Sequence, residues 1–489
     1  MPSLGRGIGV GLLASGWLAL LSLILAPLYI YLLGIESYGL IGLYTAGLAI
    51  GGILDVALSS TVSRELAWKQ ARPAEQHEIG PLLRSIEILY WLVVSSLVLV
   101  FLLVGSVFDP GWIRVQGLSE GQIKGALALM LLSLAIHIPS GLYSASLIGL
   151  NWQARSAALL AGFGTLRGVG AASLAWGFSN DIRVFFLFHV VVGLIQLITL
   201  RWQTWTYVKS LGGQSYFTVK SLMPIRKAVG AMFLITAMGM MLSQMDKFVL
   251  AFFVPLESLG HYTLAWALAG GLSIFATPIY QGFGAHFSAL AASDKSEELA
   301  SQIKLASQLT YALVVPLVVA ISVFAESILL AWVRSVNVAE ASAGVLPLVA
   351  VGTGLVTCTY PLLIAMYAKK EFKPVLQAQL FFLLLFFPSL LWLADSWGIF
   401  GAAVCWAVYG ALLFTTYLIF TAKGHDKRLF CRLLNMFVCM TSASVVVTWT
   451  IKEFAGQVFG NDIVLCMISV AVTWAGFVGA FRELRRFLG

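Results

Sequence analysis

The stretch "LLGIESYGLIGLYTAG" at residues 32–47 has a looser copy, "FVPLESLGHYTLAWALAG", at residues 253–270. Aligning Ile35–Gly39 with Leu256–Gly260 gives a constant offset of 221 residues in a chain of 489 residues. A segment that returns after so long an interval indicates a chain built from two similar halves. The composition around the two copies shows what kind of halves these are.

The chain is far too apolar for a soluble protein. Sixty per cent of its residues are hydrophobic, 11% are charged and the mean hydropathy is +0.91, whereas a soluble domain has about 25% charged residues. Apolar runs of about twenty residues or more recur along the whole chain, and a helix of that length crosses ~30 Å of hydrocarbon. The runs lack the alternation over about ten residues that marks barrel strands. The sequence therefore predicts an all-α, polytopic membrane protein.

The apolar runs predict about 14 transmembrane helices. They lie near 8–33, 38–60, 84–107, 123–149, 157–178, 183–204, 228–254, 260–289, 305–332, 343–368, 374–394, 397–421, 433–451 and 462–481. No small-residue cleavage pattern follows the first run, so we expect it to remain as a helix. Six helices separate the two copies, and an even number places both on the same side of the membrane. This predicts two six-helix bundles in a parallel pseudo-repeat, followed by two extra C-terminal helices.

The repeat also predicts the domain boundaries. We expect an N-terminal six-helix bundle at 1–209, a cytoplasmic linker at 210–226 and a C-terminal six-helix bundle at 227–422. The remaining part, 423–489, holds the two additional helices and a basic tail.

The basic residues predict the orientation in the membrane. With the N-terminus in the cytoplasm, 23 of the 30 Lys and Arg residues fall on the cytoplasmic side and five on the opposite side. Such a bias is what the positive-inside rule requires, and it places both termini in the cytoplasm. The net charge of +8 thus reflects topology and does not indicate nucleic-acid binding. The five cysteines show no CxxC spacing, so neither a disulfide framework nor a metal site is expected.

Three segments resemble the bacterial polysaccharide translocases, the Wzx-type flippases of O-antigen and other lipid-linked oligosaccharides. These belong to the multidrug/oligosaccharidyl-lipid/polysaccharide exporter superfamily. The segments are "YLLGIESYGLIGLYTAGLAIGGILDVALSSTVSRELA" (31–67), "QMDKFVLAFF" (244–253) and "GIFGAAVCWAVYG" (398–410). The matching pieces of the first are Leu33-Gly34, Tyr38-Gly39, Leu54-Asp55 with Leu58-Ser59, and Arg64-Glu65. Fourteen spans instead of twelve depart from many members, which makes the lipid II flippase branch a further relative.

The resemblance implies a non-enzymatic transporter in the bacterial inner membrane. It would move undecaprenyl-diphosphate-linked oligosaccharide from the cytoplasmic to the periplasmic leaflet by alternating access. An H⁺ or Na⁺ gradient or the membrane potential would drive it, and a polysaccharide polymerase and chain-length machinery would act beside it. The chain has no GxxxxGK[ST] phosphate loop, which agrees with a source of energy other than ATP, and no cofactor is expected.

Ionisable residues inside spans are the first candidates for a site, because each costs roughly 2.5–3.5 kcal/mol at mid-helix unless it is hydrated or paired. Arg167, in "AGFGTLRGVGAAS", lies about ten residues from either end of its span, too far for its side chain to reach an interface. Its flanking Gly164 and Gly168 form a GxxxG pattern that permits close helix approach. Arg167 either contacts the diphosphate in a cationic cleft or forms a structural ion pair, for instance with Asp55 or Glu87.

Asp246 and Lys247 are a second candidate pair in the middle of the chain. Because about 100° of helix rotation separates adjacent residues, we expect that the two side chains do not pair. Lys247 would then face the substrate in the cleft, while Asp246 could carry a coupling proton. His137, near the middle of its span, is a further candidate for substrate binding, although a lone membrane histidine often only packs.

The remaining candidates lie near the cytoplasmic side. Asp55 and Arg64 belong to the family pattern, so gating is one interpretation and a structural contact is the other. Arg155, Lys369 and Lys370 would receive the diphosphate at the cytoplasmic entrance, although topology alone also explains their charges.

Two other functions remain open. An ion-coupled multidrug or organic cation antiporter of the same superfamily would require acidic residues in the cleft, and this chain has both signs there. The other alternative is a membrane scaffold for polymer assembly with no transport role. The scaffold predicts that removing the charge of Arg167 leaves sugar export unchanged.

Overall fold

The structure of the chain is a computed structural model. It describes residues 2–107, 114–115, 117–211, 215–223, 226–293, 295–423, 427–455 and 461–480. Within these ranges every regular element is a helix, and ten stretches are long and apolar enough to cross a membrane. The prediction of an all-α, polytopic membrane protein is confirmed.

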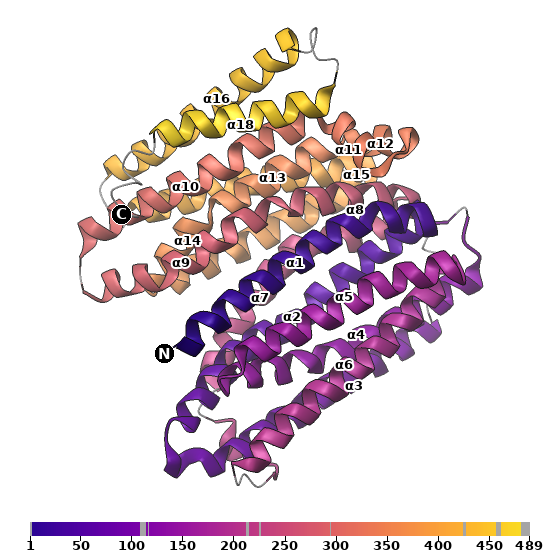
Figure 1. Cartoon of the computed structure of the whole chain (residues 1–489), viewed down its shortest axis with the longest axis vertical. Coiled ribbons are helices and arrows are strands. Elements are labelled where there is room, and N and C mark those ends of the chain that lie inside the picture. The colour runs from indigo at the N-terminus through magenta and orange to yellow at the C-terminus, as the bar shows by residue number, and fades with distance from the viewer. Residues whose placement is uncertain are drawn as a thin grey trace. The chain divides into compact units, whose positions relative to one another are not determined.

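The chain forms two compact units, Met1–Gly260 and His261–Gly489. The long helices of the first unit run alongside one another (Figure 1). They are α1 (Pro2–Leu33), α2 (Ile35–Gln70), α3 (Ile79–Val107), α4 (Glu120–Gly149), α5 (Gln153–Gly177), α6 (Ile182–Ser210) and α7 (Arg226–Phe253). A short 3₁₀ helix, Pro73–Glu78, lies between α2 and α3, and another, Val219–Ser221, lies between α6 and α7. The predicted domain boundaries, which follow the repeat, stay a prediction.

The second unit begins within α8 (Leu256–Gly270), which crosses from one unit to the other. Its further helices are α9 (Leu272–Ala292), α10 (Ser296–Val323), α11 (Ala325–Val333), α12 (Val336–Ala343), α13 (Leu346–Cys358), α14 (Tyr360–Ala368), α15 (Phe372–Lys423), α16 (Lys427–Thr450) and α18 (Asp462–Ala480). A single π turn, Ile451–Ala455, follows α16.

Each predicted span lies on one helix or on two consecutive helices. The predicted spans 374–394 and 397–421 are the two arms of α15, which bends at Gly398 (φ 58°, ψ −135°). Three other predicted spans, 260–289, 305–332 and 343–368, are each interrupted and consist of α8 with α9, of α10 with α11 and of α13 with α14. Hydropathy alone does not show such interruptions because the apolar sequence continues through them.

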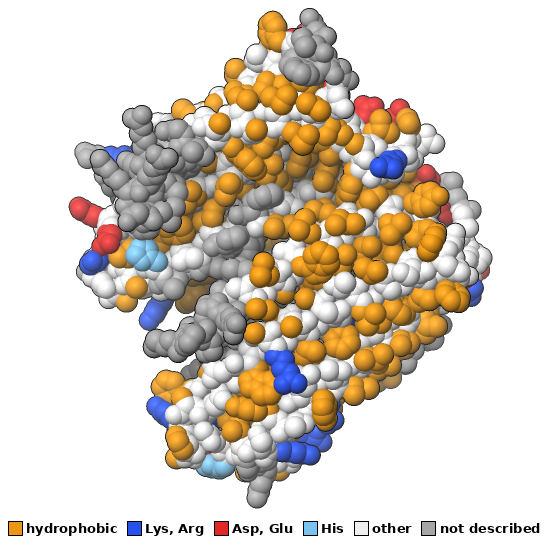
Figure 2. All heavy atoms as spheres, viewed as in Figure 1, with side chains coloured by type: hydrophobic (Ala, Val, Ile, Leu, Met, Phe, Trp, Pro, Cys, Tyr) orange, Lys and Arg blue, Asp and Glu red, His pale blue; other side chains and the backbone are white. Residues whose placement is uncertain are grey.

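Hydrophobic side chains cover most of the visible helix surface, while charged side chains lie mainly near helix ends (Figure 2). Exposed aromatic and aliphatic residues such as Trp176 (81% exposed) and Leu384 (68% exposed) are the expected outcome for helices that face lipid. In hydrocarbon each helix satisfies its own backbone hydrogen bonds, which is why helices are the elements formed by these apolar runs.

The two copies of the repeated stretch fold in the same way. In the first copy the N–H of Tyr38 donates to the carbonyl oxygen of Gly34 over 3.1 Å, and in the second the N–H of Leu259 donates to that of Pro255 over 3.1 Å. Because Tyr38 and Leu259 are 221 residues apart, as are Gly34 and Pro255, the same turn starts α2 and α8.

The two copies also touch each other, backbone to backbone, inside the first unit. A Cβ atom on Gly39 would lie 2.5 Å from the carbonyl oxygen of Leu256, and one on Gly260 would lie 2.2 Å from that of Ile35. Ile35 corresponds to Leu256 and Gly39 to Gly260, so these two contacts are equivalent across the repeat. The motif recurs with glycine in both places because each glycine admits the backbone of the other copy.

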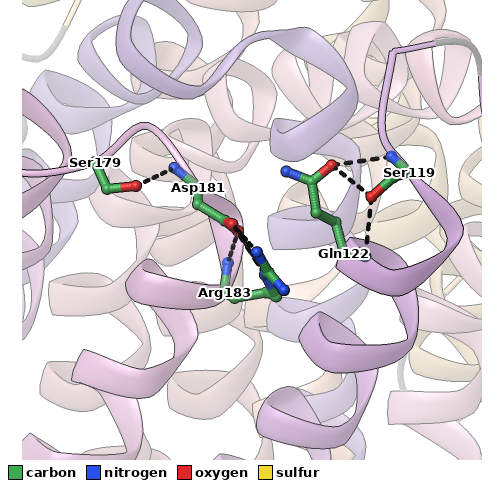
Figure 3. Close-up of polar contacts among 5 residues, drawn as sticks. All are labelled: Ser119, Gln122, Ser179, Asp181 and Arg183. Atoms are coloured by element: carbon green, nitrogen blue, oxygen red, sulfur yellow. Dashed lines mark hydrogen bonds and ion pairs between the residues drawn. The ribbon is translucent and has the colours of Figure 1, made fainter.

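Capping contacts fix the starts of α4 and α6, the two helices that later supply histidines to the candidate site. Ser119 and Gln122 form a reciprocal capping box, in which the Ser119 N–H donates to Gln122 Oε1 over 2.9 Å (Figure 3). Asp181 caps α6, because its Oδ1 accepts the N–H of Arg183 over 2.8 Å. The hydrogen-bonded Arg183 guanidinium holds the pKa of the Asp181 carboxyl below its ordinary value.

Candidate functional site

The GxxxG pattern places α5 directly on α1. A Cβ on Gly164 would lie 2.4 Å from Cδ2 of Leu18, and one on Gly168 would lie 2.6 Å from Cδ1 of Leu25. Tyr29 of α1 adds a hydrogen bond from its hydroxyl to the carbonyl oxygen of Gly168 over 2.9 Å. The close helix approach predicted from this pattern is therefore present, and Arg167 occupies a different face of α5.

Arg167 contacts a neutral amide. Its Nη2 donates to Oε1 of Gln196 on α6 over 2.5 Å. Its Nε is buried and has no hydrogen-bond partner among the described residues. A guanidinium offers five N–H donors in a plane. Arg167 therefore keeps at least its Nε–H as a donor for a ligand inside the unit.

Glu87, one of the two partners suggested for Arg167, has other partners. Its carboxylate accepts from the Tyr143 hydroxyl over 2.5 Å, from Arg84 over 2.7 Å and from Nε of Arg201 over 2.8 Å. This network joins α3, α4 and α6 around a carboxylate that is 1% exposed. Glu87 therefore has hydrogen-bond donors and counter-charges without Arg167, and this network stabilises the unit.

Polar and aromatic side chains from three other helices surround Arg167. The hydroxyl groups of Tyr44 on α2 and Ser133 on α4 are 2.7 Å apart, and the Tyr44 ring meets the His189 ring edge-on at 5.5 Å. Arg167 lies near enough to Tyr44, His137 and His189 for its charge to act on all three. We call the set Tyr44, Ser133, His137, Arg167, His189 and Gln196 the Arg167 cluster.

The Arg167 cluster combines one permanent cation with neutral hydrogen-bonding groups. Such a set suits an anion, because the guanidinium supplies charge and directed donors while hydroxyls, imidazoles and the amide complete the contacts. Arg167 and His137 of this cluster are the site candidates that the sequence predicts, and His189 follows from it as a weaker one. Gln196 was missed, although a single glutamine in the apolar run "VVVGLIQLITL" is a signal of the same kind as a mid-span arginine.

Lys247 and Asp246 form a buried pair on α7. Nζ of Lys247 lies 3.5 Å from Oδ1 of Asp246 and donates to Oε1 of Gln244 over 3.2 Å. Lys247 is 4% exposed and Asp246 is fully buried. The prediction that the adjacent side chains do not pair is wrong, because the four-carbon Lys side chain can fold back across the rotation that separates the two Cα atoms.

The gating candidates both lie on α2. The backbone of Asp55 is helical, but its side chain lies outside the described part of the chain, so its predicted partners stay untested. Arg64 is exposed near the end of the same helix, close to Lys69, whose Nζ lies 2.5 Å from Oε2 of Glu78.

The entrance candidates belong to both units. Arg155, at the start of α5, is exposed and its guanidinium lies 4.6 Å from the ring centroid of Trp152. In the second unit Lys369 follows α14 and is half-buried, whereas Lys370 is exposed in a left-handed backbone conformation (φ 60°). Burial lowers the pKa of Lys369, and the Glu371 carboxylate opposes this. Their assignment to substrate entry stays a prediction.

No protein-family model matches this chain, and no curated protein is similar to it in sequence. Solved structures do resemble it. The lipid II flippase MurJ in an inward closed conformation matches with a TM-score of 0.74 at 14% identity, over 96% of this chain and 98% of that one. An inward-facing multidrug resistance MATE transporter of the MOP superfamily matches with a TM-score of 0.65 at 14% identity, over 83% of this chain and 95% of that one.

A third structure, a MOP superfamily transporter from Pyrococcus furiosus, matches with a TM-score of 0.53 at 14% identity, over 87% of this chain and 94% of that one. At this identity the likeness concerns the fold alone. The chain is a multi-pass membrane protein with the fold of MOP-superfamily transporters. Its substrate does not follow from that likeness and has to be argued from the side chains of the site.

Proposed function

We propose that the chain is a flippase for undecaprenyl-diphosphate-linked oligosaccharide. The observation that carries this proposal is the partly buried Arg167, a cation that contacts a neutral glutamine and whose buried Nε has no partner among the described residues of a transporter fold. The diphosphate is the invariant anionic part of such a substrate. Arginine recognises phosphate oxygens by several parallel N–H···O bonds, and these bonds are stronger in a water-poor site than at a surface.

The proposal assigns a role to each candidate. Arg167 binds the diphosphate, with His137 completing the contact, while the neutralised pair Asp246 and Lys247 stabilises the unit. The other charged candidates act at the membrane surface: Asp55 and Arg64 in gating, and Arg155, Lys369 and Lys370 at the cytoplasmic entrance. The substrate would travel from the cytoplasmic to the periplasmic leaflet of a bacterial inner membrane by alternating access, with both termini in the cytoplasm.

A lipid II flippase is the second candidate, and one observation favours it. The match with MurJ spans 98% of the MurJ chain and 96% of this one. A match over almost the whole chain agrees better with fourteen spans than a match to a twelve-helix relative would. Lipid II is also a lipid-linked sugar, so the contact at Arg167 would serve either substrate. The two candidates differ in the sugar and in the polymer that depends on its transport.

Deletion of the gene in its native host tests the proposal. We expect loss of a surface polysaccharide and accumulation of one undecaprenyl-linked repeat unit, measured by extraction and mass spectrometry of lipid-linked sugars. Wild type restores export, Arg167→Ala does not, and Arg167→Lys restores it in part. Lys124→Ala is the matched control, because Lys124 carries the same charge at an exposed ion pair with Glu120, and such pairs contribute little.

Other outcomes would assign a different function. Accumulation of lipid II with lysis would select the second candidate. Unchanged polymer together with new sensitivity to cationic dyes would indicate an organic cation antiporter. Unchanged export in cells that carry Arg167→Ala would support the scaffold alternative and contradict the role of Arg167.

A further inference from the structure

One ring nitrogen of His189 is fixed by a hydrogen bond, and the other one can take up a proton. Its Nδ1 lies 2.9 Å from the carbonyl oxygen of Phe185, one turn earlier on α6. A carbonyl oxygen only accepts hydrogen bonds, so Nδ1 carries the hydrogen and Nε2 holds the lone pair. Protonation at Nε2 therefore leaves the hydrogen bond to Phe185 intact, and the ring can change its charge without losing its orientation.

The surroundings of His189 determine what a change of charge would cost. The ring is 7% exposed, lies 4.3 Å from the Phe185 ring and meets Tyr44 of α2 edge-on. The charges that act on it come from Arg167 on α5 and His137 on α4. On α3 and the far part of α6, Glu87 is already bound by Arg84 and Arg201. Among the described residues, therefore, His189 has the Arg167 cation and a second histidine beside it and no carboxylate.

Two positive charges in one buried site repel each other strongly, since the local dielectric screens them poorly. While Arg167 has, among the described residues, the neutral Gln196 as its hydrogen-bond partner, a proton on His189 is unfavourable. An anion bound to Arg167 cancels that repulsion and adds an attraction. Binding of the anion and binding of the proton must then strengthen each other by the same factor, because coupling between two sites is reciprocal.

We propose that Nε2 of His189 is a proton site linked to the anion site of this transporter, and that it takes up one proton when the diphosphate binds Arg167. This inference rests on the proposed function, since it requires an anion at Arg167. It differs from the sequence-based prediction of Asp246 as proton carrier, because Asp246 faces the lysine beside it. Because the anion and the proton bind together, the proton would cross with the substrate and reduce the net charge that has to cross the membrane.

The test measures binding of undecaprenyl diphosphate, the lipid carrier without sugar, to the purified full-length protein between about pH 6 and 8. One coupled proton makes the affinity rise by up to about tenfold for each pH unit of acidification. The carrier itself titrates near pH 6, so the informative quantity is the difference between variants. His189→Gln keeps a donor for the Phe185 carbonyl and removes the titration, and we expect it to bind with a flatter pH dependence than wild type. His77→Gln, which replaces an exposed histidine of the Pro73–Glu78 turn outside the Arg167 cluster, is the matched control and should keep the wild-type slope.

A second measurement needs no variant. At about pH 8, where the diphosphate is fully ionised, mixing wild type and carrier in weak buffer should raise the pH by uptake of close to one proton for each carrier bound. Equal pH slopes in wild type and His189→Gln, or binding without proton uptake, would overturn the proton site and leave the flippase standing. Absence of binding at every pH would overturn both proposals.

Discussion

Arg167 and Lys247 are two cations inside the same unit, the first partly buried and the second 4% exposed, and their surroundings differ in kind. Lys247 has a carboxylate next to it in the sequence, 3.5 Å away in space, and an amide that completes its contacts. Arg167 has only an amide, at 2.5 Å, and an Nε without a partner among the described residues. A neutralised pair can remain buried at all times, whereas an uncompensated cation is costly in the membrane until an anion arrives. The difference indicates which of the two serves the structure and which serves a ligand.

The largest effect should come from breaking the neutralised pair. Lys247→Met leaves Asp246 buried without its counter-ion, and loss of one partner of a buried pair costs about 3–5 kcal/mol of stability. The double variant Asp246→Asn with Lys247→Met removes both charges and should recover most of that loss. Thermal unfolding of the purified proteins measures both. If the single and the double variant unfold at the same temperature, the pair does not neutralise itself and the comparison with Arg167 fails.

Arg167→Ala should lower affinity and leave stability almost unchanged or improved. Loss of charge-assisted hydrogen bonds to the diphosphate costs about 1.5–3 kcal/mol, which corresponds to roughly 10- to 150-fold weaker binding of undecaprenyl diphosphate. The unfolding temperature should not fall, because no carboxylate among the described residues loses its partner. The variant Gln196→Leu sharpens this prediction. It removes the amide that orients Arg167, so it should weaken binding less than Arg167→Ala does.

A drop in the unfolding temperature of Arg167→Ala as large as that of Lys247→Met would contradict the comparison. It would mean that Arg167 is a structural cation like Lys247, with a carboxylate partner such as Asp55, which the sequence suggests. Measurement of both quantities on the same preparation therefore separates a binding residue from a packing residue.

Lys247 lies on α7, and the second copy of the repeated motif follows directly after this helix. That copy contacts the start of α2, and this contact allows a third test. Gly260→Ala places a Cβ 2.2 Å from the carbonyl oxygen of Ile35, and overpacking of this kind costs about 1–3 kcal/mol. Gly39→Ala should cost a similar amount, because its contact is the equivalent one. Gly230→Ala, on α7 with no atom within 4 Å of the added Cβ, is the matched control. Chemical or thermal unfolding compares the three.

If Gly260→Ala and Gly230→Ala are equally stable, the glycines of the motif are not needed for the backbone contact. The affinity for undecaprenyl diphosphate should stay close to wild type in both variants, since neither glycine belongs to the Arg167 cluster. A joint loss of stability and affinity would show that the two regions are not independent.

The sequence alone predicts the fold and one of the two compared residues, Arg167. Apolar runs determine where the helices lie, because hydrocarbon leaves no other way to satisfy the backbone, and Arg167 is conspicuous as a charge in the middle of such a run. Gln196 and Tyr44 could not be assigned to it, since they come from helices 29 and 123 residues away in the chain. Their contact with Arg167 depends on helix rotation, which hydropathy does not determine.

The error at Lys247 has a different cause. The 100° rule describes where Cα–Cβ bonds point and disregards how far a long side chain can return. The repeated motif shows a third limit. Its two glycines were visible in the sequence, yet only the structure shows that Gly39 and Gly260 each admit the backbone of the other copy.

The smallest effect should come from a charge pair outside the membrane. Asp181→Asn keeps an oxygen that can cap α6 but loses the ion pair with Arg183, so we expect a loss of less than about 1 kcal/mol at pH 7. The pKa of Asp181 is lowered by the hydrogen-bonded Arg183. Its contribution is therefore complete above the ordinary pKa of an aspartate and disappears as the pH falls through the lowered value. Wild type and Asp181→Asn should then unfold at different temperatures at pH 7 and converge in acid. A constant difference at every pH would mean that the cap, and not the charge, supplies the stability, which would set this exposed pair apart from the buried pair at Lys247.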